Sequence, residues 1–95
     1  KSSTNLWSSG TSATASQTGF VYYEANYWAS NSQTVSIRIN NKVVDKAVGL
    51  KDLNNNYAAI VAGTLPVTAG DVVSISKGSM SANSKGLYFI PGKWV

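Results

Sequence analysis

The sequence contains neither cysteine nor histidine. Without cysteine there is no disulfide framework, and without both residue types the usual ligands of structural and catalytic zinc are missing. Neither a Ser-His nor a Cys-His pair can activate a nucleophile in this chain. A serine–lysine pair is compatible with the composition, but no motif around any serine supports one. These absences exclude nucleophilic catalysis that depends on a Ser-His or Cys-His pair and zinc sites built from cysteine and histidine.

Acidic residues are almost as scarce, because the chain has only Glu24, Asp45, Asp52 and Asp71. Glycoside hydrolysis needs two carboxylates at a defined separation. Asp71 follows a glycine and is expected to cap a turn, whereas Asp45 is expected on an exposed strand face. Glu24 alone lies within a strand among aromatic residues. We therefore predict that the protein is not an enzyme and uses no cofactor.

One acidic segment needs comparison with a calcium loop, because Asp52, Asn54 and Asn56 match the opening Asp-x-Asn-x-Asn of such a loop. The rest of the pattern requires glycine at the sixth position and glutamate at the twelfth. This sequence has Tyr57 and Gly63 there. We predict a structural turn in this segment and no metal site.

Charge of either sign is sparse, since charged residues make up 13% of the chain, about half of the usual share. The net charge is +4, and all cations except Arg38 are lysines scattered along the sequence. Nucleic-acid-binding proteins usually cluster basic residues or interleave arginine with aromatics. We predict a mildly basic, solvated surface and no nucleic-acid partner. The chain also lacks an apolar run long enough to span a bilayer, so we do not expect it to be membrane-embedded.

Serine, threonine and asparagine make up about a third of the sequence. These residues favour strands and turns and disfavour helix interiors. Short segments rich in β-branched and aromatic residues recur about every ten residues, which predicts an all-β fold, a small antiparallel β-sandwich or jelly roll. The expected strands are 20–28, 34–39, 42–48, 57–61, 73–75 and 87–91, with short extended pieces at 5–7 and 65–67. Polar loops are expected at 49–56 and 78–86, and a break at 63–64.

The chain divides into a lead-in and one domain. Residues 1–18 are rich in serine and threonine, so we expect a loop-rich segment with a short strand near Trp7, which would pack as an anchor. Residues 19–95 would form the domain. Asn40-Asn41 is expected to form a two-residue hairpin turn, because asparagine tolerates positive φ. Val43 or Val44 would then face the core from the returning strand.

The strand at 20–28 has aromatic residues on both faces. Alternation places Val21, Tyr23, Ala25 and Tyr27 on one side. The opposite side carries Phe20, Tyr22, Glu24, Asn26 and Trp28. Both sides should therefore be covered. In a chain of 95 residues, the second cover could come from another subunit.

Two aromatic and amide-rich segments are candidates for binding sugar. Sites for neutral sugars combine the apolar face of tryptophan or tyrosine with the polar groups of asparagine or aspartate. The candidate residues are Tyr27, Trp28, Asn31, Lys51, Asn54, Asn56 and Tyr57. Trp28 and Tyr57 fit a role in the core or an interface equally well, and the sequence leaves both interpretations open.

Four segments, in order, resemble the C-terminal head domains of bacteriophage tail fibres. Residues 65–75 resemble their Pro-Val-x-x-Gly-Asp-x-hydrophobic segment, and Thr18-Gly19-Phe20-Val21-Tyr22 resembles their early Gly-Phe/Tyr-Val strand. Residues 37–44 resemble their Ile-x-Ile-Asn-Gly-x-x-Val hairpin, with Asn41 in place of the more common glycine. Residues 87–93 resemble their closing Phe-x-Pro-x-Lys strand.

The resemblance implies a trimeric jelly roll, similar to the C1q and tumour-necrosis-factor fold, at the tip of a fibre. It implies attachment to a host-cell saccharide or outer-membrane component, and a place in the virion after synthesis in the host cytoplasm. Because the chain starts without methionine, we interpret it as part of a longer protein. In a homotrimer, the residues expected to face the axis are Tyr22, Tyr88, Phe89 and Trp94. The alternatives are a structural trimerisation or capping module and a monomeric carbohydrate-binding module.

Overall fold

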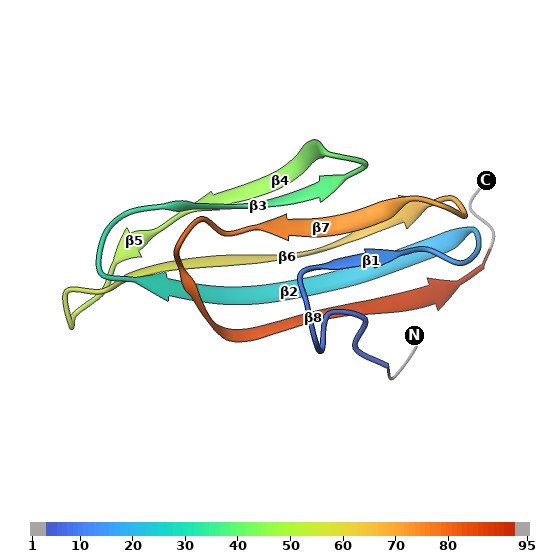
Figure 1. The fold of residues 1–95 in the computed structure, drawn as a ribbon. Coiled ribbons are helices and arrows are strands. Elements are labelled where there is room, and N and C mark those ends of the chain that lie inside the picture. Colours follow the sequence, from blue (N-terminus) through green and yellow to red (C-terminus); the bar gives the residue numbers. More distant parts are fainter. Residues whose placement is uncertain (1–3, 93–95) are drawn as a thin grey trace.

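Two four-stranded antiparallel sheets face each other in the computed structural model, which describes residues 4–92 (Figure 1). Sheet A has the strand order β1-β7-β3-β4, and sheet B has the order β5-β6-β2-β8. The strands are β1 (Ser12–Thr14), β2 (Gly19–Ala29), β3 (Thr34–Ile39), β4 (Lys42–Val48), β5 (Leu50–Lys51), β6 (Tyr57–Val67), β7 (Val72–Ser76) and β8 (Ser81–Pro91). The described residues form no helix. The predicted all-β antiparallel sandwich is confirmed.

Strand β2 is the central strand of sheet B and pairs with β6 on one side and β8 on the other. Its residues alternate strictly in burial, and those at odd positions from Val21 to Ala29 lie in the core. The residues at even positions lie on the face turned away from sheet A, here called the outer face of sheet B. The predicted assignment of odd and even positions of β2 to opposite faces is therefore confirmed.

The β3–β4 hairpin turns at Asn40 and Asn41, whose φ angles are 52° and 68°. The predicted two-residue turn is confirmed, since both central residues of such a turn need positive φ. The expectation that Val43 or Val44 faces the core is wrong, because their side chains are 50% and 44% exposed. A register shift opposite Ile37 and Arg38 changes the alternation.

Strands β6 and β8 are both longer than the sequence pattern indicates. The expected break at Gly63 is wrong, since β6 pairs with β2 through this position. Glycine is needed there because an added Cβ would lie 2.6 Å from the Tyr23 hydroxyl oxygen. The expected loop at 78–86 is also wrong in its second half, because β8 begins at Ser81 and pairs with β2 from there. Pairing with β2 extends both strands.

The N-terminal lead-in belongs to the same core as the rest of the domain. The predicted anchor is confirmed, since Trp7 is completely buried and its indole Nε1 donates a hydrogen bond to the Val73 carbonyl at 3.3 Å. The strand expected at 5–7 is wrong. The strand of this region is β1, which pairs with β7 in sheet A.

Instead of forming a strand, the start of the described chain covers the edge of β8. The Leu6 amide donates to the Leu87 carbonyl at 2.7 Å, and the Leu87 amide donates to Asn5 Oδ1 at 3.0 Å. The Asn5 side-chain amide also donates to the Lys85 carbonyl at 3.0 Å. Because exposed strand edges invite pairing with other chains, these contacts protect β8.

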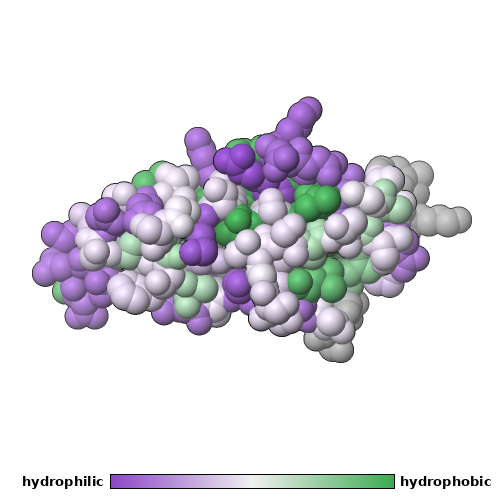
Figure 2. Space-filling view, viewed as in Figure 1, coloured by the Kyte–Doolittle hydropathy of each residue, from purple (hydrophilic) through white to green (hydrophobic). Residues whose placement is uncertain are grey.

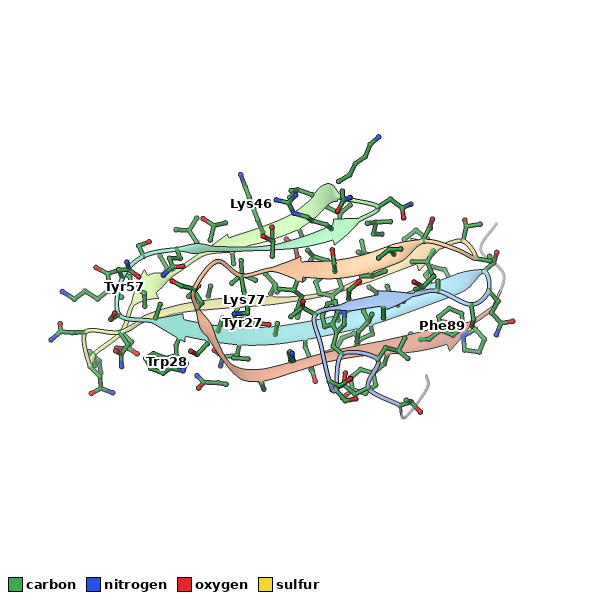
Figure 3. The ribbon with its side chains drawn as sticks, viewed as in Figure 1. Tyr27, Trp28, Lys46, Tyr57, Lys77 and Phe89 are labelled. Carbon is green, nitrogen blue, oxygen red and sulfur yellow. The ribbon has the colours of Figure 1, made fainter. Side chains whose placement is uncertain are left out.

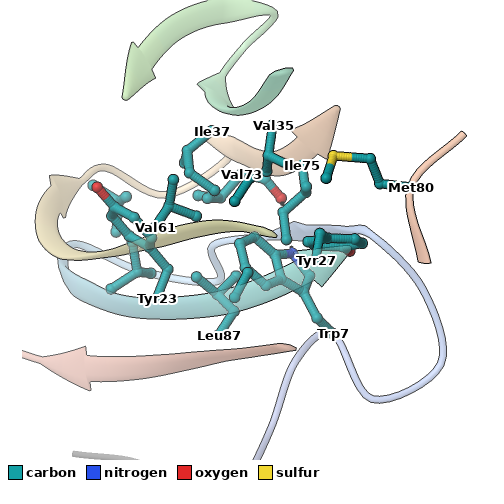
Figure 4. Packing of buried hydrophobic residues seen from close by; sticks show 14 of the residues in the cluster. Trp7, Tyr23, Tyr27, Val35, Ile37, Val61, Val73, Ile75, Met80 and Leu87 are labelled. Carbon is teal, nitrogen blue, oxygen red and sulfur yellow. Dashed lines mark hydrogen bonds between the residues drawn. The ribbon is translucent and has the colours of Figure 1, made fainter. Parts of the chain in front are cut away.

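The core between the sheets is built mainly from apolar side chains (Figure 4). A hydrogen bond between two side chains joins the sheets. The Tyr23 hydroxyl of sheet B donates a hydrogen bond to Asp45 Oδ2 of sheet A at 2.6 Å. Asp45 was expected on an exposed face, but it is half-buried and turned towards sheet B. The predicted turn cap at Asp71 is confirmed, because its Oδ2 accepts from the Thr68 amide at 2.8 Å.

Alkaline solution should destabilise the fold. Burial raises the pKa of Tyr23 and Tyr27 above the ordinary value of 10.0, and the hydrogen bond to Glu24 raises that of Tyr22. A tyrosine with a raised pKa in the folded state contributes stability that is full below the unfolded pKa and is lost as pH rises through the folded pKa. We expect the unfolding free energy to decrease above about pH 10.

Tyr23→Phe tests which tyrosine dominates this effect. We expect it to lower the unfolding free energy at neutral pH by about 1–3 kcal/mol, because Asp45 loses its donor. Above about pH 10 the decrease should be shallower than in the wild type, because a phenylalanine ring has no hydroxyl to ionise. Urea denaturation at a series of pH values measures the unfolding free energy at neutral pH and its decrease in alkaline solution. An unchanged alkaline slope would contradict the assignment to Tyr23.

Candidate functional site

A shallow hollow of about 400 Å³ lies on the outer face of sheet B. It is situated at the end of the sandwich where β2 ends beside the β5–β6 loop, close to Trp28 (Figure 3). Hydrophilic side chains gather at this end of the molecule (Figure 2). The residues that line the hollow come from β2, β6, β8 and the β5–β6 loop: Asn26, Trp28, Asp52, Asn56, Ala58 and Asn83.

Strand alternation places Asn26 and Trp28 side by side on the outer face of β2. Trp28 pairs with Ala58 on β6 and Ser81 on β8. These small neighbours leave the indole 40% exposed. The result is an aromatic surface accessible from solvent, held by the central strand of the sheet.

Asn83 reaches the hollow because of a bulge in β8. The pairing with β2 shifts so that Asn26 is opposite Ser84 whereas Tyr27 is opposite Ala82, which leaves Asn83 without a partner residue on β2. An extra residue in one strand redirects side chains locally. The bulge explains how a residue from a second strand joins Asn26 at the same hollow.

The β5–β6 loop is fixed by Asp52. Its Oδ1 accepts hydrogen bonds from the backbone amides of Asn54 at 2.8 Å and Asn56 at 3.0 Å. The Asp52 amide in turn donates to the Asn56 carbonyl at 2.7 Å, and Asn55 adopts a φ of 64°. The segment is therefore a structural turn, as predicted, and this turn holds Asn56 against the hollow.

The hollow presents one aromatic surface, three side-chain amides and one carboxylate to a ligand. Asn26 Oδ1 is buried and has no hydrogen-bond partner among the described residues. Amides and carboxylates can bond hydroxyl groups, and an indole can stack on the apolar face of a sugar ring. Among residues 4–92 no three His, Cys, Asp or Glu side chains are grouped as a metal site would require. No helix in that range could cross a bilayer.

Two of the candidate sugar-binding residues, Trp28 and Asn56, line the hollow. Tyr27 does not line the hollow. Its prediction as a contact residue is wrong, because its side chain is only 1% exposed. It faces the core because it alternates with Trp28 along β2. Its hydroxyl has no partner within the described part of the chain.

The remaining candidates lie near this end of the sandwich but outside the hollow. Tyr57 and Lys51 pair across β5 and β6 and do not line it. Asn54 is exposed in the β5–β6 loop. Asn31 is exposed in the β2–β3 turn, where its Oδ1 accepts from the Gln33 side chain at 2.7 Å. Of the seven predicted residues, two therefore line the hollow and five do not.

The residues expected at a trimer axis are not all on one surface. The rings of Tyr22 and Tyr88 lie together on the outer face of sheet B, with centroids 6.3 Å apart and planes inclined by 30°. Phe89 lies on the opposite face of β8, where it pairs with the core residue Val21 and is half-buried against the core. Trp94 lies outside the described residues.

Sequence reasoning missed Asn26, Asp52, Asn83 and Ala58 as lining residues. The signal for Asn26 was present, because it shares a strand face with Trp28. Asp52 belongs to the segment 51–57 that is a candidate for sugar binding, but the sequence singles it out only in the comparison with a calcium loop. Asn83 gave no signal, because the bulge that directs it to the hollow depends on pairing with β2.

Comparison with known proteins adds no family to this description. No protein-family model matches the chain, and no curated protein matches it.

Proposed function

We propose that this chain is a non-enzymatic host-attachment domain that binds a cell-surface saccharide at the Trp28 hollow. The observation that carries the proposal is the combination of a 40% exposed indole with three side-chain amides and a carboxylate around one hollow. Sites for small polar ligands typically combine an apolar surface with a few placed polar groups. The resemblance to tail-fibre heads supports a place at the tip of a phage fibre in the virion.

Binding to glycans and to whole bacteria tests this proposal. We expect the domain to bind some members of a bacterial glycan array and to adhere to cells that display those glycans. Soluble glycan should compete with the cells. If the domain binds cells but no glycan, and proteolysis of the cell surface removes that binding, the receptor is an outer-membrane protein and the saccharide proposal is wrong.

A structural trimerisation or capping module is the second candidate. It is favoured by the Tyr22–Tyr88 ring pair on the outer face of sheet B, because aromatic residues are enriched at interfaces. Two measurements together distinguish the candidates: light scattering coupled to size exclusion gives the oligomeric state, and the glycan array gives saccharide binding. A trimer without any glycan or cell binding indicates the structural module, and a glycan-binding monomer indicates a carbohydrate-binding module. A trimer that binds glycan indicates the proposed fibre head.

A further inference from the structure

A second hollow continues from the first along the outer face of sheet B. Its volume is about 330 Å³, and Asn26 lines both hollows. The other residues of the second hollow come from β2, β6 and β8: Glu24, Ala25, Ile60, Val61, Ala62 and Ser84. Because they share Asn26, the two hollows are neighbours along β2, and together they are here called the track.

Aromatic rings are present at both ends of this track. Trp28 lies at one end, and the Tyr22–Tyr88 pair lies beyond Glu24 at the other. The Tyr88 ring lies over Gly86, where an added Cβ would be 2.8 Å from it. Tyr22 and Trp28 are six positions apart on β2, which corresponds to roughly 20 Å along an extended strand. That length is several times the size of a single sugar ring.

The track is acidic, although the chain as a whole carries a net charge of +4. Its lining contains Glu24 and Asp52, and no lysine or arginine lines either hollow in the described part of the chain. Lys51 lies near the Trp28 hollow without lining it, whereas Lys46 projects away from sheet A (Figure 3) and Lys85 Nζ donates to the Gly10 carbonyl at 2.8 Å. The only charged residues in the lining itself would repel an anionic ligand, so the lining fits an uncharged one.

We propose that the ligand is an uncharged, linear oligosaccharide that runs along β2 from Trp28 to the Tyr22–Tyr88 pair. This inference rests on the proposed saccharide-binding function. Asn26, Glu24 and Ser84 would bond hydroxyl groups in the middle of the chain, and aromatic rings would contact sugar units at both ends. Internal units of a polymer would be bound, with no requirement for a chain terminus.

A subunit contact fits the same face less well. Interface cores are depleted of charged residues, whereas Glu24 is exposed in the middle of this face. Its Oε2 accepts a hydrogen bond from the Tyr22 hydroxyl at 3.0 Å, which holds the carboxylate beside the ring pair. Hollows on both sides of Asn26 also leave space that a ligand could fill.

The dependence of affinity on chain length tests this inference. The polysaccharide recognised on the glycan array is partially hydrolysed and fractionated by size, and each fraction is titrated by calorimetry. We expect affinity to increase from single sugars to fragments long enough to span the track and then to level off. Tyr88→Ala should reduce affinity for the long fragments about tenfold and leave that for the shortest fragments unchanged. Charged polysaccharides on the array should bind more weakly than neutral ones.

Leu53→Ala is the matched control, because Leu53 is fully exposed and lies outside both hollows. It should leave all affinities unchanged, and thermal melting checks that Tyr88→Ala is folded.

Four outcomes would contradict these proposals. Saccharide binding that does not depend on chain length or on Tyr88 would show that the ligand does not run along the track, and would leave the proposed function intact. If anionic glycans bind most strongly, the proposal that the ligand is uncharged is wrong. A trimer that dissociates in Tyr88→Ala would show instead that this face is a subunit contact. Absence of binding to every glycan would overturn the proposed function itself.

Discussion

Trp28→Ala is expected to weaken saccharide binding by at least about tenfold, which corresponds to about 1.4 kcal/mol. The indole is the only aromatic side chain that lines the Trp28 hollow among the described residues. Its removal takes away the apolar surface on which a sugar ring would stack, while the amides around it remain. Titration calorimetry with the glycan identified on the array measures the loss. We expect only a small change in unfolding free energy, because the side chain is 40% exposed.

Two asparagines of one loop provide a matched pair for this experiment. Asn56 lines the hollow, whereas Asn54 is exposed in the same turn and does not. Both backbone amides bond to Asp52, so replacing either side chain leaves these backbone contacts of the turn in place. Asn56→Ala should weaken binding and Asn54→Ala should not. Equal effects of the two, or full affinity in Trp28→Ala, would place the binding site elsewhere on the molecule.

Trp7→Ala is expected to be the most destabilising single change, with a loss of about 3–5 kcal/mol in unfolding free energy. The indole is completely buried between the sheets, and its Nε1 donates to the Val73 carbonyl of sheet A. A domain of this size has a total stability of only about 5–15 kcal/mol. The melting temperature should therefore decrease by more than about 10 °C.

Differential scanning calorimetry and urea denaturation measure this effect. Trp28→Ala removes a side chain of the same type from an exposed position and is the control, with a much smaller expected decrease. Trp7→Phe should retain part of the stability, because it fills part of the same space. A Trp7→Ala protein that melts like the wild type would show that the lead-in is separable from the sandwich.

The part of the candidate site that lies on β2 could be derived from strand periodicity alone. Alternation placed Asn26 and Trp28 on one face of β2, and both line the hollow. The same periodicity places Tyr27 on the opposite face of β2, so the sequence itself argues against Tyr27 in a site that contains Trp28. Asn83 differs, because only the mismatch between β2 and β8 creates the bulge that directs it to the hollow.

The sequence by itself determined the fold class, the two-sided character of β2, the Asn40–Asn41 turn and the buried role of Trp7. These features depend on local alternation, on the tolerance of asparagine for positive φ and on the size of a single apolar side chain. The tertiary structure decided the lengths of β6 and β8, the exposure of Val43 and the inward orientation of Phe89. The strand lengths and the orientation of Phe89 depend on pairing with β2, which is distant in the sequence, and the exposure of Val43 depends on the register shift inside the β3–β4 hairpin. Neither pairing can be derived from the alternation of one strand alone.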